Sequence, residues 1–500
     1  MKKKLASAII ILLFILQLFI ACGGENRPDD ETSRQYAEEQ TAEVLDPNAR
    51  INKKDSLPAD LNFNGQEIRI LKRANNQWEL DFPNELNGDI VNDAVYDKNI
   101  RVQERLNVKF KLGVCPRGDE FSGTIEDIRI ICLSGDDVYD LISMNLNMIC
   151  TYGTSPTTPF FMDLSSMPYL DLEQPWWNTR TIKEISHDGK SYNLVFGDSS
   201  FTLISYTTCV FYNKHIYNNY YGDPDELYKI ALDGKWTYDV FADKCKEMYE
   251  DLNGDGVADV SDQFGLQFDW YIFNNYMLGS SDARMSSRDS EGIVQIDMDM
   301  NRLTTFCEKL YDFCYNNPGV KYYPKNEPLF APLFLGRNMV FSANYLSRAI
   351  EYRAMEDDYG ILPMPKLDDL QSEYRSMMTV HIVSLSIPKP CKIPETVCAV
   401  MEALASDGYR NVTELYYEVA LKTKYSRDEY SGQVMDLICS TQYNDFLSAY
   451  LAHVNNAAFI VYEVVGVGKS TDIMSYYAKN ENVYKNSLEK LINNLSNGVV

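Results

Sequence analysis

The chain has 500 residues, 45% of them hydrophobic and 12% aromatic, which is long enough for two or three domains with cores of their own. Acidic residues outnumber basic residues by 72 to 47, and the formal net charge is −25. Without clusters of Lys and Arg to neutralise phosphates, this acidity excludes a nucleic-acid partner, and it argues against a strongly anionic ligand unless a locally basic pocket overrides it.

The first 22 residues have the form of an export signal. Three Lys residues at 2–4 precede an apolar run at 5–20, and Ala21 stands directly before Cys22. This order resembles a bacterial lipoprotein signal, in which the Cys becomes the lipidated first residue of the mature protein. We therefore expect residues 1–21 to be a signal peptide and Cys22 to anchor the body to the extracytoplasmic face of the cell membrane. An uncleaved transmembrane anchor is the alternative, and it also leaves the body outside.

Residues 22–61 are polar and acidic, which predicts a flexible tether between the anchor and the body. Ten further Cys residues follow Cys22 without a C-x-x-C motif, and a body of this size folds without disulfides, so we expect buried free thiols. Cys307 and Cys314 are seven apart in a helical pattern and belong on one face of that helix. The four His residues are too scattered for a zinc-binding spacing.

Strands and helices alternate after the tether. The spacing of apolar residues predicts strands at 65–71, 108–112 and 139–144, and helices at 92–106 and 125–131. This alternation is typical of an α/β sheet, whose ligands bind beyond the carboxyl ends of the strands. Trp78, Asn145 and Asn147 follow strands and are candidate ligand contacts. A turn role for each Asn, and a partly buried surface position for Trp78, are the alternatives.

Residues 251–262 form the sharpest chemical motif in the chain. Oxygen-bearing groups recur at positions 1, 3, 5, 7, 9 and 12, with Gly256 at position 6, which is the spacing of a calcium-binding loop. Asp262 replaces the usual Glu, and a strand-like run at 263–268 follows, so a structural Ca²⁺ site is expected rather than a switch. The alternative is a loop of Asx turns without a metal. The expected ligands are Asp251, Asn253, Asp255, the Val257 carbonyl, Asp259 and Asp262.

Five short motifs occur in order along the chain. They are residues 183–198, preceded by Pro-Trp-Trp-Asn at 175–178; Phe-Tyr-Asn-Lys at 211–214; Gly-Lys-Trp-Thr-Tyr-Asp-Val-Phe at 234–241; Tyr-Gly-Ile-Leu-Pro-Met-Pro at 359–365; and Ala-Leu-Lys-Thr-Lys-Tyr at 420–425. Together, and after a lipoprotein-like signal, they resemble the family 1 extracellular solute-binding proteins of ABC importers. Tyr238 stands where that family usually has Trp. The resemblance covers the chain from about residue 62 onward.

The resemblance implies a periplasmic-binding-protein-like fold with two α/β lobes and a hinge of crossing strands. By that comparison, the first lobe holds residues 62–163 and 383–439, and the second holds residues 164–382 and 440–500. The crossings fall near residues 164–167, 381–386 and 440, and the ligand binds in the cleft between the lobes. Two lobes hinged in this way close on a ligand and present a distinct surface only when closed.

A sugar presents C–H faces to aromatic rings and hydroxyls to polar groups, so its site combines Trp or Tyr with Asp and Asn. In the second lobe, the candidates follow the strands expected at 263–268 and 339–341 or the segment 201–205. A place in the core of a lobe is the alternative for each aromatic residue. The expected ligand contacts are Trp78, Asn145, Asn147, Tyr206, Asp269, Trp270, Tyr271, Asn344 and Tyr345.

The sequence therefore predicts a monomeric, non-enzymatic lipoprotein that captures a small solute, in particular a carbohydrate, and delivers it to an ABC permease in the membrane. One alternative is a secreted carbohydrate-active enzyme, which requires two carboxylates at a fixed separation but is supported by no hydrolase motif in the chain. The other is a lipoprotein that presents its ligand to a membrane sensor. Both binding roles use the same fold.

Overall fold

A computed structural model describes residues 50–72, 81–114, 121–153, 160–269, 273–323, 330–417 and 430–496. The chain from Lys53 onward forms one compact unit, so the predicted lobe boundaries remain predictions. The predicted signal peptide and Cys22 lie outside the described residues, as do Trp78, Trp270 and Tyr271. Among the helices that are described, none is both long and apolar enough to cross a membrane.

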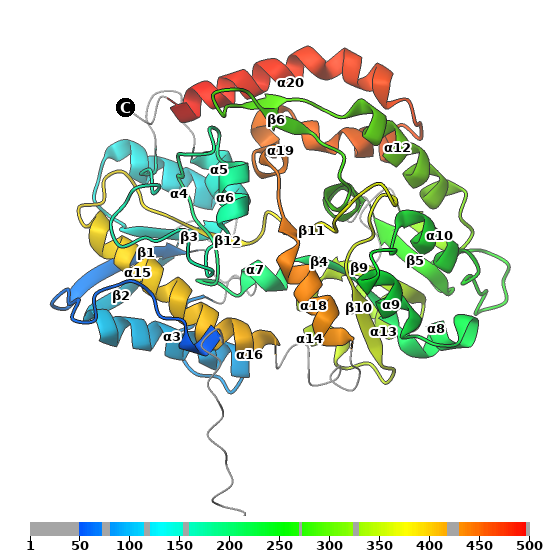
Figure 1. The fold of residues 1–500 in the computed structure, drawn as a ribbon, viewed down its shortest axis with the longest axis horizontal. Helices are drawn as coiled ribbons and strands as arrows, with labels where there is room; N and C mark the ends of the chain where they lie inside the picture. The colour runs from blue at the N-terminus through cyan, green and yellow to red at the C-terminus, as the bar shows by residue number, and fades with distance from the viewer. Residues whose placement is uncertain are drawn as a thin grey trace, which may run out of the picture. The chain divides into compact units, whose positions relative to one another are not determined.

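A four-stranded sheet is built from the strands predicted near the start of the body and one late strand. Its order is β12 (Val383–Ser386), β3 (Leu141–Asn145), β1 (Gln66–Lys72) and β2 (Val108–Val114), as Figure 1 shows. β1 is parallel to β2 and β3, whereas β12 is antiparallel to β3. The predicted helices are α3 (Ile90–Leu106), which begins at an Asp89 cap, and α4 (Phe121–Ser134). The predicted opening of the body is therefore confirmed.

A five-stranded mixed sheet forms the other half of the unit. Its order is β10 (Tyr359–Leu362), β4 (Thr208–Asn213), β9 (Met339–Tyr345), β5 (Phe264–Asp269) and β8 (Val320–Tyr323). Figure 1 shows these strands grouped apart from the first sheet. β5 is parallel to β8 and β9, and β4 is antiparallel to β9 and β10. Two sheets with helices between their strands give the predicted α/β class.

Helices cover both sheets. α15 (Pro394–Asp407) packs against α3, α10 (Tyr238–Lys246) against β5, and α13 (Phe330–Leu335) against β9. α12 (Met300–Tyr315) packs against β8 and against the long α20 (Ile473–Ser496), which lies along the outer side of α12 in Figure 1. The other helices include α5 (Leu146–Tyr152), α6 (Thr179–Ile185), α7 (Thr202–Ser205), α8 (Lys214–Tyr221), α9 (Glu226–Leu232), α14 (Ala349–Tyr352), α16 (Glu414–Tyr416), α18 (Ser431–Ser440) and α19 (Phe446–Ala449).

The remaining short elements are β6 (Ser286–Arg288), β7 (Val294–Ile296), β11 (Ser376–Met377) and β13 (Gln442–Tyr443). Turns of 3-10 helix are η1 (Arg50–Asn52), η3 (Leu346–Arg348), η6 (Leu451–Val454) and η7 (Ala457–Phe459), and π-helical turns are η2 (Phe273–Leu278), η4 (Gly408–Thr413) and η8 (Tyr462–Val467).

Two of the family-like motifs meet in the core beside the five-stranded sheet. Trp236 is fully buried, and its indole N–H donates to the Pro363 carbonyl at 2.9 Å. Backbone hydrogen bonds join Lys366 N to Trp236 O at 3.0 Å and Tyr238 N to Lys366 O at 2.8 Å. The Thr237 side chain caps the start of α10 by accepting from Val240 N at 3.4 Å. These two stretches of sequence are therefore one structural unit in space.

The chain changes sheets later than the predicted crossing at 164–167. Residues 160–200 remain with the four-stranded sheet, because Val195 and Leu385 exchange backbone hydrogen bonds of 3.0 and 2.8 Å. Met162 N also donates to Ile387 O at 2.9 Å. The first passage to the five-stranded sheet comes at Tyr206 and Thr207, directly before β4. The second lies between β11 and β12, close to the predicted crossing at 381–386.

Two further boundaries differ in detail from the sequence-based scheme. α18, which the predicted boundaries place in the first lobe, packs against β10 and α9 of the five-stranded half. Residues 53–61, predicted as tether, belong to the folded unit, where the Asp55 carboxylate pairs with Arg105 at 2.6 Å and accepts from Ser406 Oγ at 2.7 Å. The polar composition of this stretch does not predict these contacts, because its charged side chains form ion pairs with the body and bury little apolar surface.

The described Cys residues confirm the expectation of free thiols. Eight are buried, including Cys307 and Cys314 on the buried face of α12, and Cys439 is half-buried. Desolvation raises the pKa of the Cys307 thiol to about 12, so it stays protonated and inert. Cys115 lies outside the described residues.

A buried carboxylate fixes the segment before α6 onto α15. Glu402 is fully buried and accepts hydrogen bonds from the indole N–H groups of Trp176 at 3.0 Å and Trp177 at 2.9 Å, and from Asp171 N at 3.2 Å. Burial outweighs these donors and raises the pKa of Glu402 to about 7.

This pKa predicts a stability that falls as pH rises. Between the unfolded pKa of about 4.5 and the folded pKa of about 7, the native state binds more protons than the unfolded state, so the free energy of unfolding declines by up to about 3 kcal/mol. Urea unfolding at pH 4.5 and 7.5 measures the decline. Glu402→Gln lowers stability by about 1–3 kcal/mol, because an amide cannot accept from all three donors, and it removes most of the decline. An equal pH dependence in both proteins would contradict this assignment.

Candidate functional site

Three connections between the sheets are hydrogen-bonded to one another. Thr207 pairs with Met378 in a short antiparallel bridge, and β11 pairs in parallel with β13. Asn444 is fully buried, and its amide donates to Met378 O at 2.6 Å while its Oδ1 accepts from Asp445 N at 2.8 Å. The amide of Gln442 donates to Thr207 Oγ1 at 2.9 Å. The passages of the chain at 207, 378 and 442–444 therefore form one junction.

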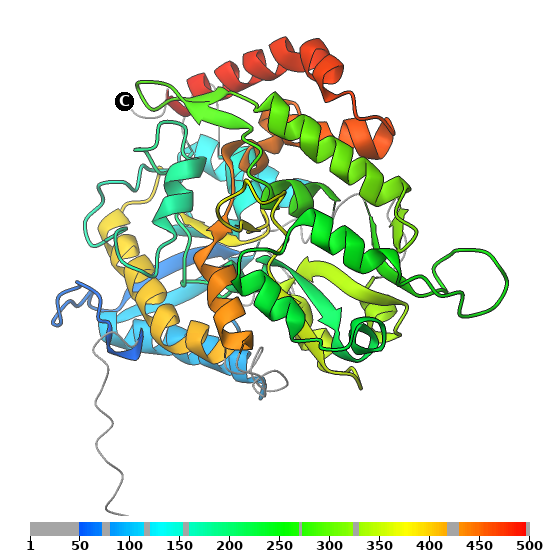
Figure 2. The same cartoon turned by 45° about the vertical axis from the view of Figure 1, so that its right-hand side comes forward.

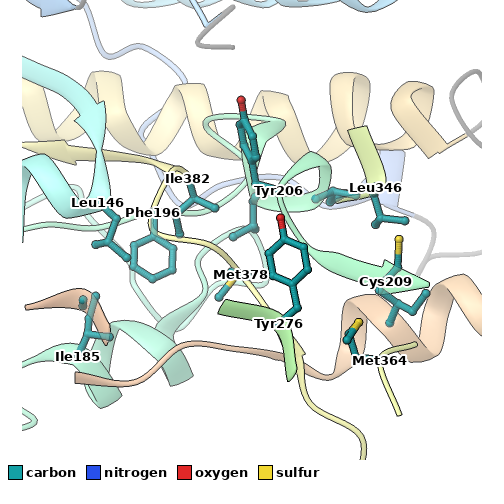
Figure 3. Packing of buried hydrophobic residues seen from close by; sticks show 14 of the residues in the cluster. Leu146, Ile185, Phe196, Tyr206, Cys209, Tyr276, Leu346, Met364, Met378 and Ile382 are labelled. Atoms are coloured by element: carbon teal, nitrogen blue, oxygen red, sulfur yellow. The ribbon is translucent and has the colours of Figure 1, made fainter. Parts of the chain in front are cut away.

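A cluster of aromatic and polar side chains lies directly beside this junction. The Tyr206 ring packs edge-on against Tyr345 at 5.4 Å between centroids, and it lies 6.2 Å from His381. Tyr345 also packs against Tyr276 at 5.1 Å. The Asn145 amide lies 3.5 Å from His381 Nδ1, which connects the end of β3 to the same cluster. Figure 3 shows Tyr206 and Tyr276 in the same packed region as Met378 and Ile382.

A pocket continues from this cluster along the same backbone segments. Its cavity volume is about 40 Å³. Its walls come from the segment after η2, from the second connection and from the chain after β13. The lining residues are Leu278, Gly279, Ser281, Ala283, Met285, Arg375, Met377, Val380, Tyr443, Asp445, Ser448, Leu451, Ala458 and Phe459.

Both halves of the unit border the pocket. Val380, in its wall, accepts a backbone hydrogen bond from Asn147 N at 3.1 Å, and Asn147 lies on α5 directly after β3. Leu451 belongs to η6, which packs against α5. The opposite wall, from Leu278 onward, follows β5 of the five-stranded sheet. The pocket therefore lies where the two sheets and their connections meet.

The polar side chains of the pocket differ in how many of their donors and acceptors have partners within the protein. The Arg375 guanidinium lies 4.7 Å from the Tyr443 ring centroid, and its Nη1 donates to Ser281 O at 3.2 Å. Asp445 accepts from Ser448 N at 3.0 Å and from Ser448 Oγ at 2.5 Å. Burial raises the pKa of Asp445 despite these donors, and it raises the pKa of Tyr443 above the usual range. Asp445 is thus already satisfied by its own turn.

The structure brings three of the predicted ligand contacts together. Asn145 and Tyr206 both lie against His381, and Tyr345 packs against Tyr206 in the same cluster. Asn147 stands at the edge of the pocket, and its Oδ1 is buried without a hydrogen-bond partner among the described residues. None of the predicted contacts that are described lines the pocket itself. Their role in binding remains a prediction.

Asn344, Tyr345 and Asp269 lie within strands and not in the loops where the sequence placed them. β9 continues to Tyr345 because β4 pairs with it to the end, with Thr208 opposite Tyr345. β5 continues to Asp269 because β8 pairs with it, with Tyr323 opposite. Burial first, and then neighbouring charges that include Asp269, raise the pKa of Tyr322 and of Tyr462. Asp269 therefore lies among these tyrosines.

Sequence reasoning missed the polar residues that do line the pocket. Arg375, Tyr443, Asp445 and Ser448 belong to none of the motifs and follow no long strand. The only signal in the sequence was the expected crossing near residue 440, since residues beside a crossing border the cleft.

The predicted calcium loop lies between α10 and β5 and extends away from the sheet (Figure 2). Asp251 accepts from Gly254 N at 2.7 Å and Gly256 N at 2.9 Å, and both glycines have a positive φ. Asp262 is fully buried and accepts from Leu252 N at 3.2 Å and Asp259 N at 3.1 Å.

The carboxylates of the loop already accept hydrogen bonds from its own backbone, and a bound cation would have to replace them. Within the described ranges, no group of three or more His, Cys, Asp and Glu side chains is placed to hold a metal ion. The oxygen donors are of the chemical type that Ca²⁺ prefers, but a cation competes with the hydrogen bonds that the loop makes to itself. Calcium binding remains a prediction.

Comparisons with solved structures match almost the whole body of the chain. The GacH receptor of Streptomyces glaucescens GLA.O, solved without ligand and with acarbose, is 10% identical at a TM-score of 0.50, covering 85% of this chain and 99% of that one. UgpB from Mycobacterium tuberculosis, in complex with glycerophosphocholine, is 13% identical at a TM-score of 0.52. The match covers 80% of this chain and 96% of that one. The binding protein from B. animalis subsp. lactis Bl-04, in complex with β-1,6-galactobiose, is 12% identical at 0.50, covering 85% and 98%.

These likenesses show the fold. No protein-family profile and no curated protein matches the sequence. The chain has the two-lobed, periplasmic-binding-protein-like α/β fold that its sequence predicts.

The junction predicts a specific cost for losing one amide. Asn444→Ala leaves the Met378 carbonyl and the Asp445 N–H without partners in a buried place, so the free energy of unfolding falls by about 2–3 kcal/mol. Chemical unfolding measures this loss. Ser440→Ala is the control, since the Ser440 hydroxyl is exposed and bonds only back to Leu437 O. Equal stability of the two variants would show that Asn444 does not hold the connections together.

Proposed function

We propose that the protein is a solute-binding protein that captures a carbohydrate in the pocket between its two sheets and delivers it to an ABC importer. The observation that carries the proposal is the position of the pocket, which both halves border beside the connections between them. Binding there ties the two halves together, so a ligand biases the hinge toward a closed form. The solved structures of similar fold support the same role.

The lining of the pocket suits a carbohydrate. Apolar walls from residues such as Met285 and Phe459 face the C–H groups of a sugar ring, and a few polar groups reach its hydroxyls. Tyr443 adds an aromatic face with a polar tip. The neighbouring cluster of Tyr206, Tyr345 and Asn145 offers the same kinds of group beside the pocket.

Delivery to the membrane completes the proposal. A lipidated Cys22 keeps the protein at the extracytoplasmic face, where a permease recognises the closed, loaded form as a monomer. Presentation of the ligand to a membrane sensor uses the same closed form. A carbohydrate-active enzyme is disfavoured because Asp445, which is the one carboxylate among the described residues that line the pocket, is engaged by Ser448.

Thermal unfolding of the full chain in mild detergent tests the proposal against a panel of mono- and oligosaccharides. A bound sugar raises the midpoint as its concentration exceeds Kd, by roughly 2–8 °C at a hundredfold excess, and is recovered unchanged. Val380→Trp fills the pocket and abolishes the shift. Val467→Trp, at a position that is 58% exposed, preserves it. Turnover of the sugar would establish the enzyme, and a shift that survives Val380→Trp would place the site elsewhere.

We also propose that residues 251–262 bind Ca²⁺ through oxygens of Asp251, Asn253, Asp255, Asp259 and Asp262 and the Val257 carbonyl. Calcium at millimolar concentration then raises the unfolding midpoint by roughly 2–5 °C over a chelator, because the ion binds only the folded loop. Asp255→Ala removes this shift. Asp233→Ala, which removes an exposed charge outside the loop, retains it. The same midpoint with calcium and with chelator would favour a metal-free loop of Asx turns.

A further inference from the structure

Several hydrogen-bond donors in the wall of the pocket have no acceptor among the described residues. Arg375 carries five N–H groups, and within the described residues it makes one hydrogen bond, to Ser281 O, and no ion pair. The Tyr443 hydroxyl below it makes no hydrogen bond to any described residue. Both groups lie in the wall of the pocket. Arg375 is half-buried, so its free N–H groups are open to acceptors from a ligand or from water.

The other polar groups of the pocket are occupied. Ser281 Oγ donates to Leu278 O at 2.8 Å and accepts from Ala283 N at 3.3 Å. Ser448 Oγ donates to Asp445, whose two carboxylate oxygens are both engaged by that residue. The free capacity of the pocket is therefore concentrated in Arg375 and Tyr443, and it is donor capacity.

The local charge differs from that of the whole chain. Asp445 accepts from neutral donors and makes no ion pair with Arg375 among the described residues, although the guanidinium charge acts on the carboxylate electrostatically. Glu184 and Arg180, on α6, also act electrostatically on Tyr443 and offset one another in sign. An anion that enters the pocket is stabilised where it meets the guanidinium of Arg375.

We infer that Arg375 selects a carbohydrate that carries an oxyanion, either the carboxylate of a sugar acid or a phosphate ester. The inference rests on the proposed function and names the class of its ligand. A planar guanidinium matches a carboxylate or a phosphate through two parallel N–H···O bonds, whereas a sugar hydroxyl accepts only one. The Tyr443 ring lies 4.7 Å from the guanidinium and helps to position it, and the Tyr443 hydroxyl supplies a further donor.

Isothermal titration calorimetry on the full chain in mild detergent tests this with matched sugars. The series are glucose, glucuronate and glucose 6-phosphate; galactose, galacturonate and galactose 6-phosphate; and oligomers of two to four units of galactose and of galacturonate. We expect an anionic member to bind at least about tenfold more tightly than its neutral partner. The carboxylate and phosphate arms identify the source of the oxyanion.

Substitution of the guanidinium provides the second arm. Arg375→Gln weakens the anionic ligand by about 10- to 100-fold and leaves any neutral sugar within about twofold, while Arg375→Lys loses less because it keeps the charge. Tyr443→Phe keeps the ring under Arg375 and weakens binding by a smaller factor. Arg284→Gln is the matched control, since Arg284 stands between the pocket residues Ala283 and Met285 but pairs outward with Asp297 at 3.1 Å.

The possible outcomes distinguish carbohydrate binding by the pocket from selection of an oxyanion by Arg375. Preference for a neutral sugar, or an anionic ligand whose affinity is the same in Arg375→Gln, would overturn the role of Arg375 and leave the carbohydrate-binding proposal intact. Binding of no sugar in any series would overturn both. The comparison of neutral and anionic sugars needs only the unmodified protein, so it decides the inference even if Arg375→Gln does not fold.

Discussion

The hydrogen bonds among the three connections are the constraint on which this structure depends. Each sheet has its own packed helices, and the chain passes between the sheets at Thr207, Met378 and the segment around Asn444. Because these passages bond to each other, the two sheets are joined at one place. A pocket between the sheets is then a consequence of how they are connected, and its walls belong to the connections as much as to the sheets.

Buried polar groups locate the rigid parts of each half. Glu402 holds Trp176 and Trp177 against α15, and Trp236 donates to Pro363 beside the five-stranded sheet. In both cases an indole N–H satisfies an oxygen that would otherwise be buried alone, which is costly. The same reasoning distinguishes the pocket, where Arg375 and Tyr443 retain unused donors while Asp445 and the serines do not. The unused donors of Arg375 and Tyr443 are therefore available to a ligand in the pocket.

Several features could be predicted because they depend on local pattern. The elements from β1 to β3 follow the spacing of apolar residues, and the cap of α10 follows from Thr237 before a helical run. The positions of Asn344 and Asp269 were wrong by a few residues, since a strand extends as long as a partner pairs with it and the partner is far away in sequence. The chain also stays beside the four-stranded sheet beyond the crossing expected at 164–167, because Val195 and Leu385 pair across nearly two hundred residues.

The sequence by itself determined the fold class, the buried thiols of α12 and the kind of residues to expect in a sugar site. Periodicity and residue type carry this information because they act over one or two turns of helix or a single strand. Only the tertiary structure decided that Asn145 and Tyr206 meet at His381 with Tyr345 packed against Tyr206, and that Arg375 and Tyr443 line the pocket instead. Their proximity depends on long-range pairing between the connections. No short stretch of the sequence predicts this pairing.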